Sequence, residues 1–304
     1  MQGTGGGGVG AMSVLVLTKD EERDLPGCLQ SVHWSDDVHV LDSYSTDRTV
    51  EIARELGAHV VQRRFDGYAS QRNYGLRELP FRHPWVLMLD ADERVPAEAI
   101  EALRSFARET PATVGAGRMR RRDYWWGRWL RHAQISPFYV RILRPSRVRF
   151  EREVNEVPVV DGEIAEIAGH FDHFPFSKGL EHWIAKHNTY SRMEAQLIAA
   201  REVIRPSLGI ALLGADFNER RVHQKAIFYR LPARPFIKLI YMLVVRRAVL
   251  DGWAGVRYAI LQAIYEYFIV LKTKEFLAEG GAPTSAPPAA SVIALTNAKS
   301  SKLS

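Results

Sequence analysis

The sequence predicts an α/β fold, a mainly parallel sheet covered by helices, followed by a C-terminal amphipathic helical section. Short apolar, β-branched runs alternate with helical stretches from residue 13 to about residue 89, the pattern of parallel strands joined by helices. Two longer apolar stretches lie between residues 235 and 271. With 46% apolar residues in 304, the chain can bury a sizeable core, which excludes a disordered or fibrous protein.

Composition limits the partners and the compartment. Lysine and arginine number 41 against 35 Asp and Glu, so the net charge of +6 favours anionic partners without requiring nucleic acid. The single cysteine, Cys28, excludes an internal disulfide framework and fits a reducing compartment. The Gly-rich residues 1–11 are expected to form a flexible leader, with the true start at Met1 or Met12. No secretory signal is evident, so we expect a cytoplasmic location.

Four runs have the length and composition of buried parallel strands. Apolar residues at helical spacing between them predict the covering helices. The four strands are Val14–Leu17, Val38–Leu41, Ala58–Val61 and Val86–Leu89. In an open parallel sheet, ligands bind beyond the carboxyl ends of the strands, where loops and helix N-termini meet.

Acidic side chains gather at that predicted edge of the sheet. They occur in the loops 18–21, 42–47 and 90–93, each directly after a predicted strand. Arg63-Arg64 follows the remaining strand and supplies cations that can meet a phosphate. The strongest single signal is Asp90-Ala91-Asp92, because two carboxylates at a strand end suit a hard divalent cation that takes its other ligands from water and a diphosphate. The alternative is that the acids cap the helix expected near Pro96.

The composition changes sharply between Arg118 and Arg152, where eleven arginines accompany only two acids. Trp125, Trp126 and Trp129 are interleaved with them, so the segment is expected to form a basic, aromatic surface. Short strands around 139–143 and 157–160 and a helix from about 180 to 201 should follow. His170 and His173 share one face of a strand-like segment, and without a third ligand a structural or acceptor-contacting role is preferred over a metal site.

The C-terminal apolar stretches are joined by Arg246-Arg247 and an Asp251-Gly252 turn. Neither stretch holds eighteen uncharged residues, so a pair of interfacial helices is expected rather than a membrane-spanning helix. The remaining tail is rich in Gly, Ala, Pro and Ser and is expected to be disordered.

Taken in order, these motifs resemble family 2 glycosyltransferases with the GT-A fold. The resemblance is closest to the lipopolysaccharide core β-1,4-glucosyltransferase-like branch and extends from residue 12 to about 275. The segments that carry it are 18–22, 40–49, 71–73, 89–93, 141–144, 154–156, 186–191 and 251–255. It implies a nucleotide-sugar half (12–115), an acceptor half (116–180), a helical membrane-associating section (181–275) and a tail (276–304).

The resemblance also implies an inverting transfer of a hexose, with glucose favoured, from a UDP-sugar. Asp42 would accept a hydrogen bond from uracil, while Asp47 is equally readable as a helix cap or a ligand. Asp90 and Asp92 would lie at the ribose and at a Mg²⁺ or Mn²⁺ ion, and both are candidate metal ligands. The residues expected to contact the donor are Thr18, Glu21, Asp42, Asp47, Arg72, Asn73, Asp90 and Arg141. Alternating side-chain direction predicts that only one of Arg141 and Arg144 faces the site.

An inverting transfer needs a carboxylate base, and Glu156 is the first candidate. The alternatives are that Glu156 is a surface residue paired with Arg149 or Arg152, and that Asp123, beside the tryptophans, is the base. The expected acceptor is a lipid-linked glycan at an anionic membrane surface, with the enzyme peripheral on the inner face of the cytoplasmic membrane. A polyprenyl-linked oligosaccharide is a second acceptor, and a basic module without catalysis is an alternative of another class.

At two positions, Asp20 and Asn155, the chain has a different residue from the one usual in the family. Asp20 stands where the first motif usually has Asn, which should change a local hydrogen bond more than the fold. Asn155 stands where the core glucosyltransferases have His, so the acceptor is expected to differ from inner-core heptose.

Overall fold

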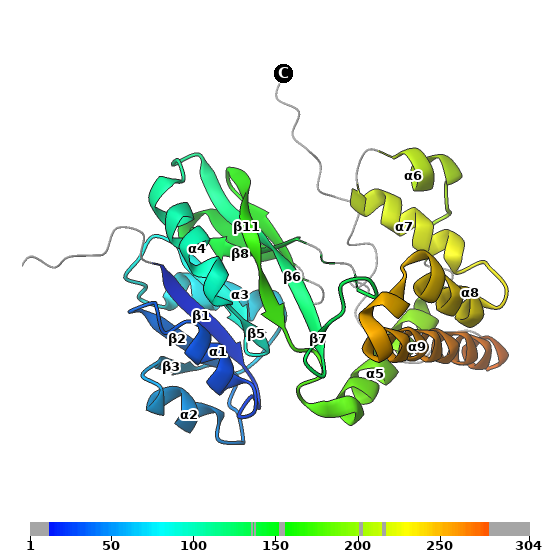
Figure 1. Ribbon diagram of the computed structural model, residues 1–304, viewed down its shortest axis with the longest axis horizontal. Helices are drawn as coiled ribbons and strands as arrows, with labels where there is room; N and C mark the ends of the chain where they lie inside the picture. Colours follow the sequence, from blue (N-terminus) through cyan, green and yellow to red (C-terminus); the bar gives the residue numbers. More distant parts are fainter. Residues whose placement is uncertain are drawn as a thin grey trace, which may run out of the picture. The chain divides into compact units, whose positions relative to one another are not determined.

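A computed structural model describes residues 12–134, 136, 138–151, 156–200, 203–214 and 217–279 of the chain, with the side chains of 217–219 left aside. The chain divides into two compact units, one ending at Lys178 and one beginning at Gly179. This division lies two residues before the boundary expected from the sequence. Figure 1 shows the strands of the first unit in blue to green and the helices of the second in green to orange.

The first unit is built on one large sheet with the strand order β3-β2-β1-β4-β8-β6-β11-β5, and β7 pairs with β6. The pairs among β1 to β4 are parallel, whereas β8 is antiparallel to both β4 and β6. The bounds are β1 Ser13–Thr18, β2 Val38–Asp42, β3 His59–Gln62, β4 Val86–Asp90, β5 Glu93–Arg94, β6 Val114–Trp125, β7 Arg128–Trp129, β8 Phe138–Leu143 and β11 Glu163–His173. The four strands predicted first are confirmed, the third shifted by one residue.

Helices cover both faces of this sheet. Alternate side chains of β1 supply the two cores: Val14 and Val16 pack with α1 and α4, and Leu15 packs with α3. Cys28 of α1 is buried in the first of these cores. The helices are α1 Leu25–Ser31, α2 Thr49–Glu55, α3 Tyr68–Glu78 and α4 Ala97–Glu109, and a small two-stranded sheet joins β9 Val148–Glu151 to β10 Val157–Val160 after the 3-10 turn η1 Pro145–Arg147.

The arginine-rich segment is largely strand, which its composition did not reveal. Strands β6 and β11 pair in parallel along most of their length. The arginines of β6 lie on aromatic rings of its neighbour β8: Arg118 and Arg120 over Phe138, and Arg121 over Tyr139. Such stacking buries the apolar stems and faces of basic side chains, so a charged sequence can form a central strand.

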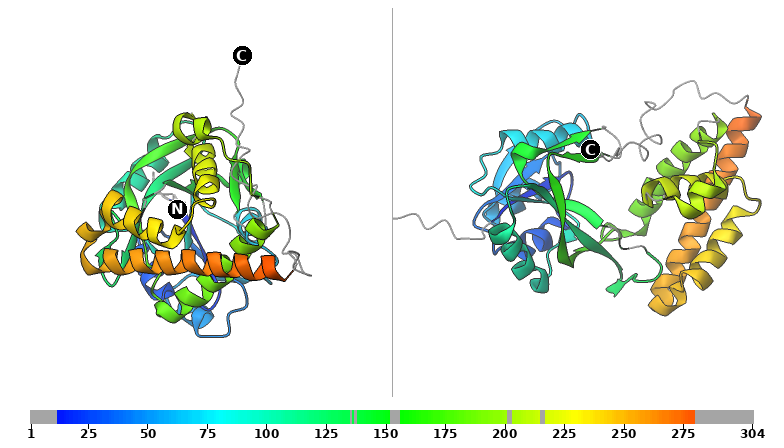
Figure 2. Two further views of the ribbon diagram at one scale, coloured as in Figure 1. Left: turned by 90° about the vertical axis from the view of Figure 1, so that its right-hand side faces the viewer. Right: turned by 90° about the horizontal axis from the view of Figure 1, so that it is seen from above.

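The second unit is helical. Its elements are α5 Gly179–Ala199, α6 Leu208–Leu213, α7 Phe217–Phe228, α8 Arg234–Ile240, the π-helical turn η2 Tyr241–Val245, the 3-10 turn η3 Ala248–Asp251 and α9 Gly252–Ala278. Figure 2 shows α9, in orange, as the longest of them. The helix near 180–201 and the turn at Asp251-Gly252 are as predicted. Helix α9 continues three residues into the predicted tail, and residues 280–304 lie outside the described ones.

The turn between α8 and α9 depends on backbone conformations that few residues adopt. Arg247 has φ 58° and Gly252 has φ 69°. A Cβ at Gly255 would lie 2.0 Å from the carbonyl oxygen of Ala248, so only glycine permits this approach. The turn therefore has a defined shape.

Among the residues that the structure describes, one helical stretch, Ala248–Ala278, is long and apolar enough by length and composition to cross a membrane. The apolar segment that the sequence shows here begins at Tyr258 and is too short by itself to span a membrane. The structure adds η3 and the first turns of α9 to the same helix.

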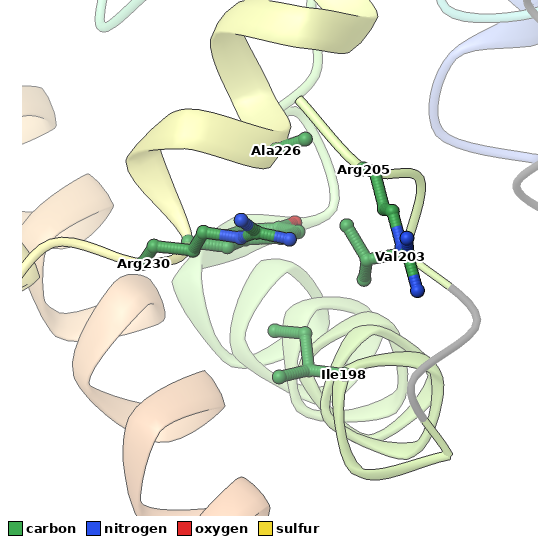
Figure 3. A pocket seen from close by; sticks show the side chains of 6 residues that line it. Ile198, Val203, Arg205, Ala226 and Arg230 are labelled. Carbon is green, nitrogen blue, oxygen red and sulfur yellow. The ribbon is translucent and has the colours of Figure 1, made fainter. Parts of the chain in front are cut away.

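The second unit also contains a small cavity of about 350 Å³. It is lined by Ile198, Val203, Arg205, Ala226, Tyr229 and Arg230. Figure 3 shows the side chains of Arg205 and Arg230 beside the apolar Ile198 and Val203.

Candidate active site at the carboxyl ends of the parallel strands

The loops after β1 and β2 are locked together through Asp42. Strand register places Thr18 opposite Asp42, and the Thr18 hydroxyl donates to Asp42 Oδ1 at 2.9 Å. The same carboxylate, fully buried, accepts from the backbone N–H and hydroxyl of Ser45 and from the Gln62 amide. All its favourable acceptor directions are used, so the expected contact with uracil would have to displace one of these donors. In this structure, Asp42 and Thr18 organise the loops.

Asp20 and Asp47 strengthen the same junction. Asp20 has φ 53° and accepts from the Thr46 backbone N–H at 2.7 Å, which an Asn side-chain oxygen would do equally well. The departure from Asn is therefore local, as expected. Asp47 accepts from the backbone N–H groups of Thr49 and Glu22, each at 3.0 Å. Asp47 thus holds the first residue of α2 from one position before the N-cap, Arg48.

Glu21 has an unsatisfied oxygen. Its Oε1 accepts from Lys178 Nζ at 2.7 Å, whereas Oε2 is buried with no hydrogen-bond partner among the described residues. Burial raises the pKa of Glu21 to about 7, against the opposing effect of Lys178. A buried acceptor without a donor fits a bound group that supplies an N–H or O–H. Lys178 lies 157 residues away in sequence and was not predicted.

At the end of β4, two arginines hold the Asp90 carboxylate. Arg141 Nη2 lies 2.7 Å from Oδ2, and Arg72 Nη2 lies 3.1 Å from Oδ1. Desolvation opposes ionisation, but the two guanidinium groups outweigh it and hold the pKa of Asp90 far below its usual range. Because each oxygen is neutralised by an arginine, the prediction of Asp90 as a direct metal ligand is not supported.

Arg141 also binds the fully buried Glu93 at 2.7 Å, a residue that the sequence analysis did not assign to the site. Burial raises the pKa of Glu93, and Arg141 opposes the rise. Arg144 instead lies over the Trp85 ring and donates to the Val114 carbonyl. Of this pair, Arg141 contacts the acids at the end of β4, whereas Arg144 contacts Trp85 and Val114.

Arg72 connects Asp90 to Glu156. Its Nε donates to Glu156 Oε1 at 2.9 Å while its Nη2 contacts Asp90, so one buried guanidinium holds the candidate base beside the end of β4. The alternative partner Arg149 pairs with Glu151. Residues 152–155, including Arg152 and Asn155, lie outside the described residues.

Asn73 contacts no part of this cluster. Its side-chain amide donates to the Phe150 carbonyl at 2.8 Å, and its oxygen accepts from the Phe150 N–H at 2.7 Å. The side chain thereby joins α3 to β9 through the same backbone groups of Phe150 that a neighbouring strand would bind. The structure therefore gives Asn73 a role in joining α3 to β9, and its contact with the donor stays a prediction.

His173 joins Asp92 to Asp123. The register of β11 with β6 places His173 beside Asp123, to which its Nδ1 is hydrogen-bonded, and its Nε2 lies 3.2 Å from Asp92 Oδ2. Although burial favours the neutral ring, these carboxylates raise the pKa of His173 to about 9. Asp123 is 2% exposed and also pairs with Arg121, so it is poorly placed to meet an acceptor hydroxyl.

Asp92 and His173 are the protein groups best suited to a divalent cation. The Asp92 side chain is 31% exposed, and the imidazole nitrogen facing it can become a second ligand when the ring loses its proton. In the described part of the chain, no three His, Cys, Asp or Glu residues are arranged to hold an ion. This donor set fits a cation that takes most of its ligands from a diphosphate and water. His170 instead lies against the Trp129 ring.

The family model for glycosyl transferase family 2 matches residues 13–164, half of the chain, which includes Glu21, Asp42, Asp90, Asp92 and Glu156 but not His173 or Lys178. The chain belongs to family 2 of the glycosyltransferases. The sheet order described above, together with the family, identifies its fold as GT-A. Membership also sets aside the alternative of a basic module without catalysis.

The chain is similar to several named relatives of this family. An uncharacterized glycosyltransferase of Rickettsia bellii is 39% identical over 88 residues, which is 29% of each chain. The lipopolysaccharide core biosynthesis glycosyltransferase LpsC of Rhizobium meliloti is 26% identical over 194 residues, 60% of this chain and 70% of that protein. The chain thus spans under a third of the Rickettsia relative and a larger share of LpsC.

Among solved structures, the chain resembles glucosyl-3-phosphoglycerate synthase from Mycobacterium tuberculosis, in complex with Mn²⁺, UDP and glucosyl-3-phosphoglycerate. The identity is 21%, the TM-score 0.32, and the match covers 37% of this chain and 44% of that one. Mannosyl-3-phosphoglycerate synthase from Rubrobacter xylanophilus matches with 20% identity and a TM-score of 0.33, covering 37% and 40% of the two chains.

Proposed function

We propose that this glycosyltransferase moves a hexose, with glucose favoured, from a UDP-sugar to a lipid-linked glycan of the lipopolysaccharide core type, with inversion at the anomeric carbon. The observation that carries the proposal is the Arg72 bridge, which holds a carboxylate, Glu156, beside Asp90 at the end of β4. The name of the relative LpsC supports the acceptor class.

The donor would bind across the loops after β1 and β4. The unsatisfied Glu21 oxygen is suited to accept from an N–H or O–H of the nucleoside. Asp90, ionised between two arginines, is suited to accept from a ribose hydroxyl. Arg72 and Arg141 offset the negative charge of the carboxylates at the ends of these strands, so a diphosphate can approach.

Asp92, with His173 behind it, would hold the divalent cation, Mg²⁺ or Mn²⁺. When bound, such an ion stabilises the negative charge that develops on the departing diphosphate. The hydrogen bond from His173 to Asp123 fixes the orientation of the ring, so its other nitrogen faces Asp92.

In the transfer, the acceptor oxygen forms a bond to the anomeric carbon while the bond to the diphosphate oxygen breaks. Glu156 takes the proton of the acceptor hydroxyl in the same step. The Arg72 contact through Nε uses one Glu156 oxygen, which leaves the other to meet the acceptor.

The testing experiment is UDP release from a panel of UDP-sugars, with and without Mg²⁺ or Mn²⁺, in the presence of membrane extract. The Asp92→Asn variant is the negative control, and Glu163→Gln, an exposed acid at the start of β11, is the matched control for surface charge. Metal-dependent release from one sugar, lost in Asp92→Asn and retained in Glu163→Gln, supports the proposal. No release from any UDP-sugar, with no binding of UDP by calorimetry, overturns the donor assignment.

A further inference from the structure

Large apolar side chains are exposed together at the turn between α8 and α9. Val244, Val245, Val249, Leu250 and Trp253 expose 68%, 65%, 52%, 55% and 74% of their surface. These five residues lie within the ten positions 244–253, in η2, η3 and the start of α9, and we call them the apolar tip. A contiguous apolar patch of this kind usually marks a surface that meets a partner or a membrane.

The charge around the apolar tip has one sign. Residues 231–271 contain two acids, Asp251 and Glu266, and both are buried. The basic residues Lys238, Arg246 and Arg257 are partly or fully exposed, as is Arg247 within the turn. The outward charge of the segment is therefore entirely positive, which complements an anionic surface.

The backbone gives the apolar tip a defined shape. Arg247 and Gly252, both at positive φ, delimit η3, and Gly255 allows α9 to start against the Ala248 carbonyl. Exposed Trp253 adds an aromatic ring of the kind enriched at membrane–water interfaces. Apolar and aromatic side chains accompanied by Lys and Arg are also the composition of segments that bind at a membrane interface.

Polar contacts tie α9 to its neighbours. Lys272 Nζ donates to the Asn188 carbonyl at 2.7 Å and to the Ser191 hydroxyl at 2.8 Å, both on α5. Buried Glu266 of α9 lies 3.3 Å from Arg234 of α8. A membrane-spanning α9 would have to lose these contacts or carry the ion pair into hydrocarbon, which is costly. The contacts favour a helix that lies at the interface over one that spans.

We propose that the apolar tip inserts into the boundary between headgroups and acyl chains of an anionic phospholipid bilayer. Arg246 and Arg247 contact the lipid phosphates, and Trp253 lies at the level of the headgroups. The protein is then peripheral on the inner face of the cytoplasmic membrane. This inference does not depend on the donor or the acceptor of the proposed reaction.

The test is co-sedimentation of the full chain with vesicles of phosphatidylcholine, alone or mixed with phosphatidylglycerol. One variant carries three substitutions, Val249→Ser, Leu250→Ser and Trp253→Ser. It is expected to bind the anionic vesicles at least about tenfold more weakly, because the apolar surface of these side chains is no longer removed from water on binding. Arg246→Gln with Arg247→Gln should weaken it by about fivefold per charge and remove most of its salt dependence.

The matched control is Leu212→Ser with Leu213→Ser on α6, which removes two apolar side chains that are 73% and 87% exposed. It should bind vesicles as the wild type does, and far-UV circular dichroism verifies that all variants fold. Equal binding to neutral and anionic vesicles overturns the proposal, as does a loss confined to the α6 variant. Retention in the membrane after a carbonate wash would indicate a spanning helix. Dimerisation without lipid, abolished by the triple variant, would assign the apolar tip to a second copy.

Discussion

His173 Nε2 lies 3.2 Å from Asp92 Oδ2, so the second carboxylate of the Asp90-Ala91-Asp92 motif faces a protonated imidazole. The same ring is hydrogen-bonded to Asp123 on β6. Three residues, one in the turn after β4, one on β6 and one at the end of β11, thus form one chain of contacts. A cation that binds Asp92 is repelled by the positive charge of His173. Cation binding at Asp92 and protonation of His173 therefore oppose each other.

In the metal-free protein, His173 is expected to titrate at about 9, and Asp92→Asn should lower that pKa by about one unit or more, because an opposite charge is removed. Mg²⁺ should also lower it in the wild type. The imidazole signals in nitrogen-detected NMR measure the titration. An unchanged pKa in Asp92→Asn would show that the contact does not exist in solution.

Glu21→Gln is expected to stabilise the fold at alkaline pH. The folded pKa of Glu21, about 7, is above its ordinary value of 4.5, so ionisation in the folded state is unfavourable. Stability therefore falls as pH rises from about 4.5 to 7 and stays lower above. The amide removes this penalty, and the gain should be about 1–2 kcal/mol at pH 8 and near zero at pH 4.

Urea denaturation at the two pH values measures this gain. The exposed Glu51→Gln, which pairs with Arg48, is a control expected to show no such gain at alkaline pH. A Glu21→Gln effect of equal size at both pH values would contradict the assignment.

Glu156→Gln is expected to lower kcat by at least about 100-fold while UDP affinity stays within about threefold, because the amide cannot take the acceptor proton. Glu156→Asp keeps a carboxylate and should retain measurable transfer. Activity assays and calorimetry on both variants separate a base from a residue that only supports Arg72. The assignment is wrong if Asp123→Asn abolishes transfer and Glu156→Gln does not.

Asn73→Ala is expected to lower the free energy of unfolding by about 2 kcal/mol, because two hydrogen bonds to Phe150 are lost. UDP affinity should stay unchanged, since the side chain contacts β9 and not the site. Thermal denaturation and calorimetry give the two quantities. Gln30→Ala, at an exposed position of α1, should change neither. A large loss of UDP affinity without a loss of stability would support the donor-binding role predicted from the sequence.

Local patterns in the sequence were sufficient for the parallel half of the sheet. Strand β4 and the acids after it were predicted because apolar runs and strand-end loops are properties of neighbouring residues. Strand β6 was missed because its arginines obscure the alternation of apolar and polar residues that is typical of a strand. The aromatic side chains of β8, over which these arginines lie, explain how such a strand fits inside the sheet.

The sequence by itself determined the family, the strands that lead to the acidic loops, and the residue types at the site. The tertiary structure decided which of those residues meet. Arg72 reaches Glu156 across 84 positions, Asn73 reaches Phe150 across 77, and His173 reaches Asp123 across 50. These pairings follow from strand order and register, which result from burying whole elements against one another. The sequence therefore shows which residues are carboxylates and what chemistry they can perform. Packing decides which partner each carboxylate contacts, and that partner decides whether it acts as a cap, a bridge or a base.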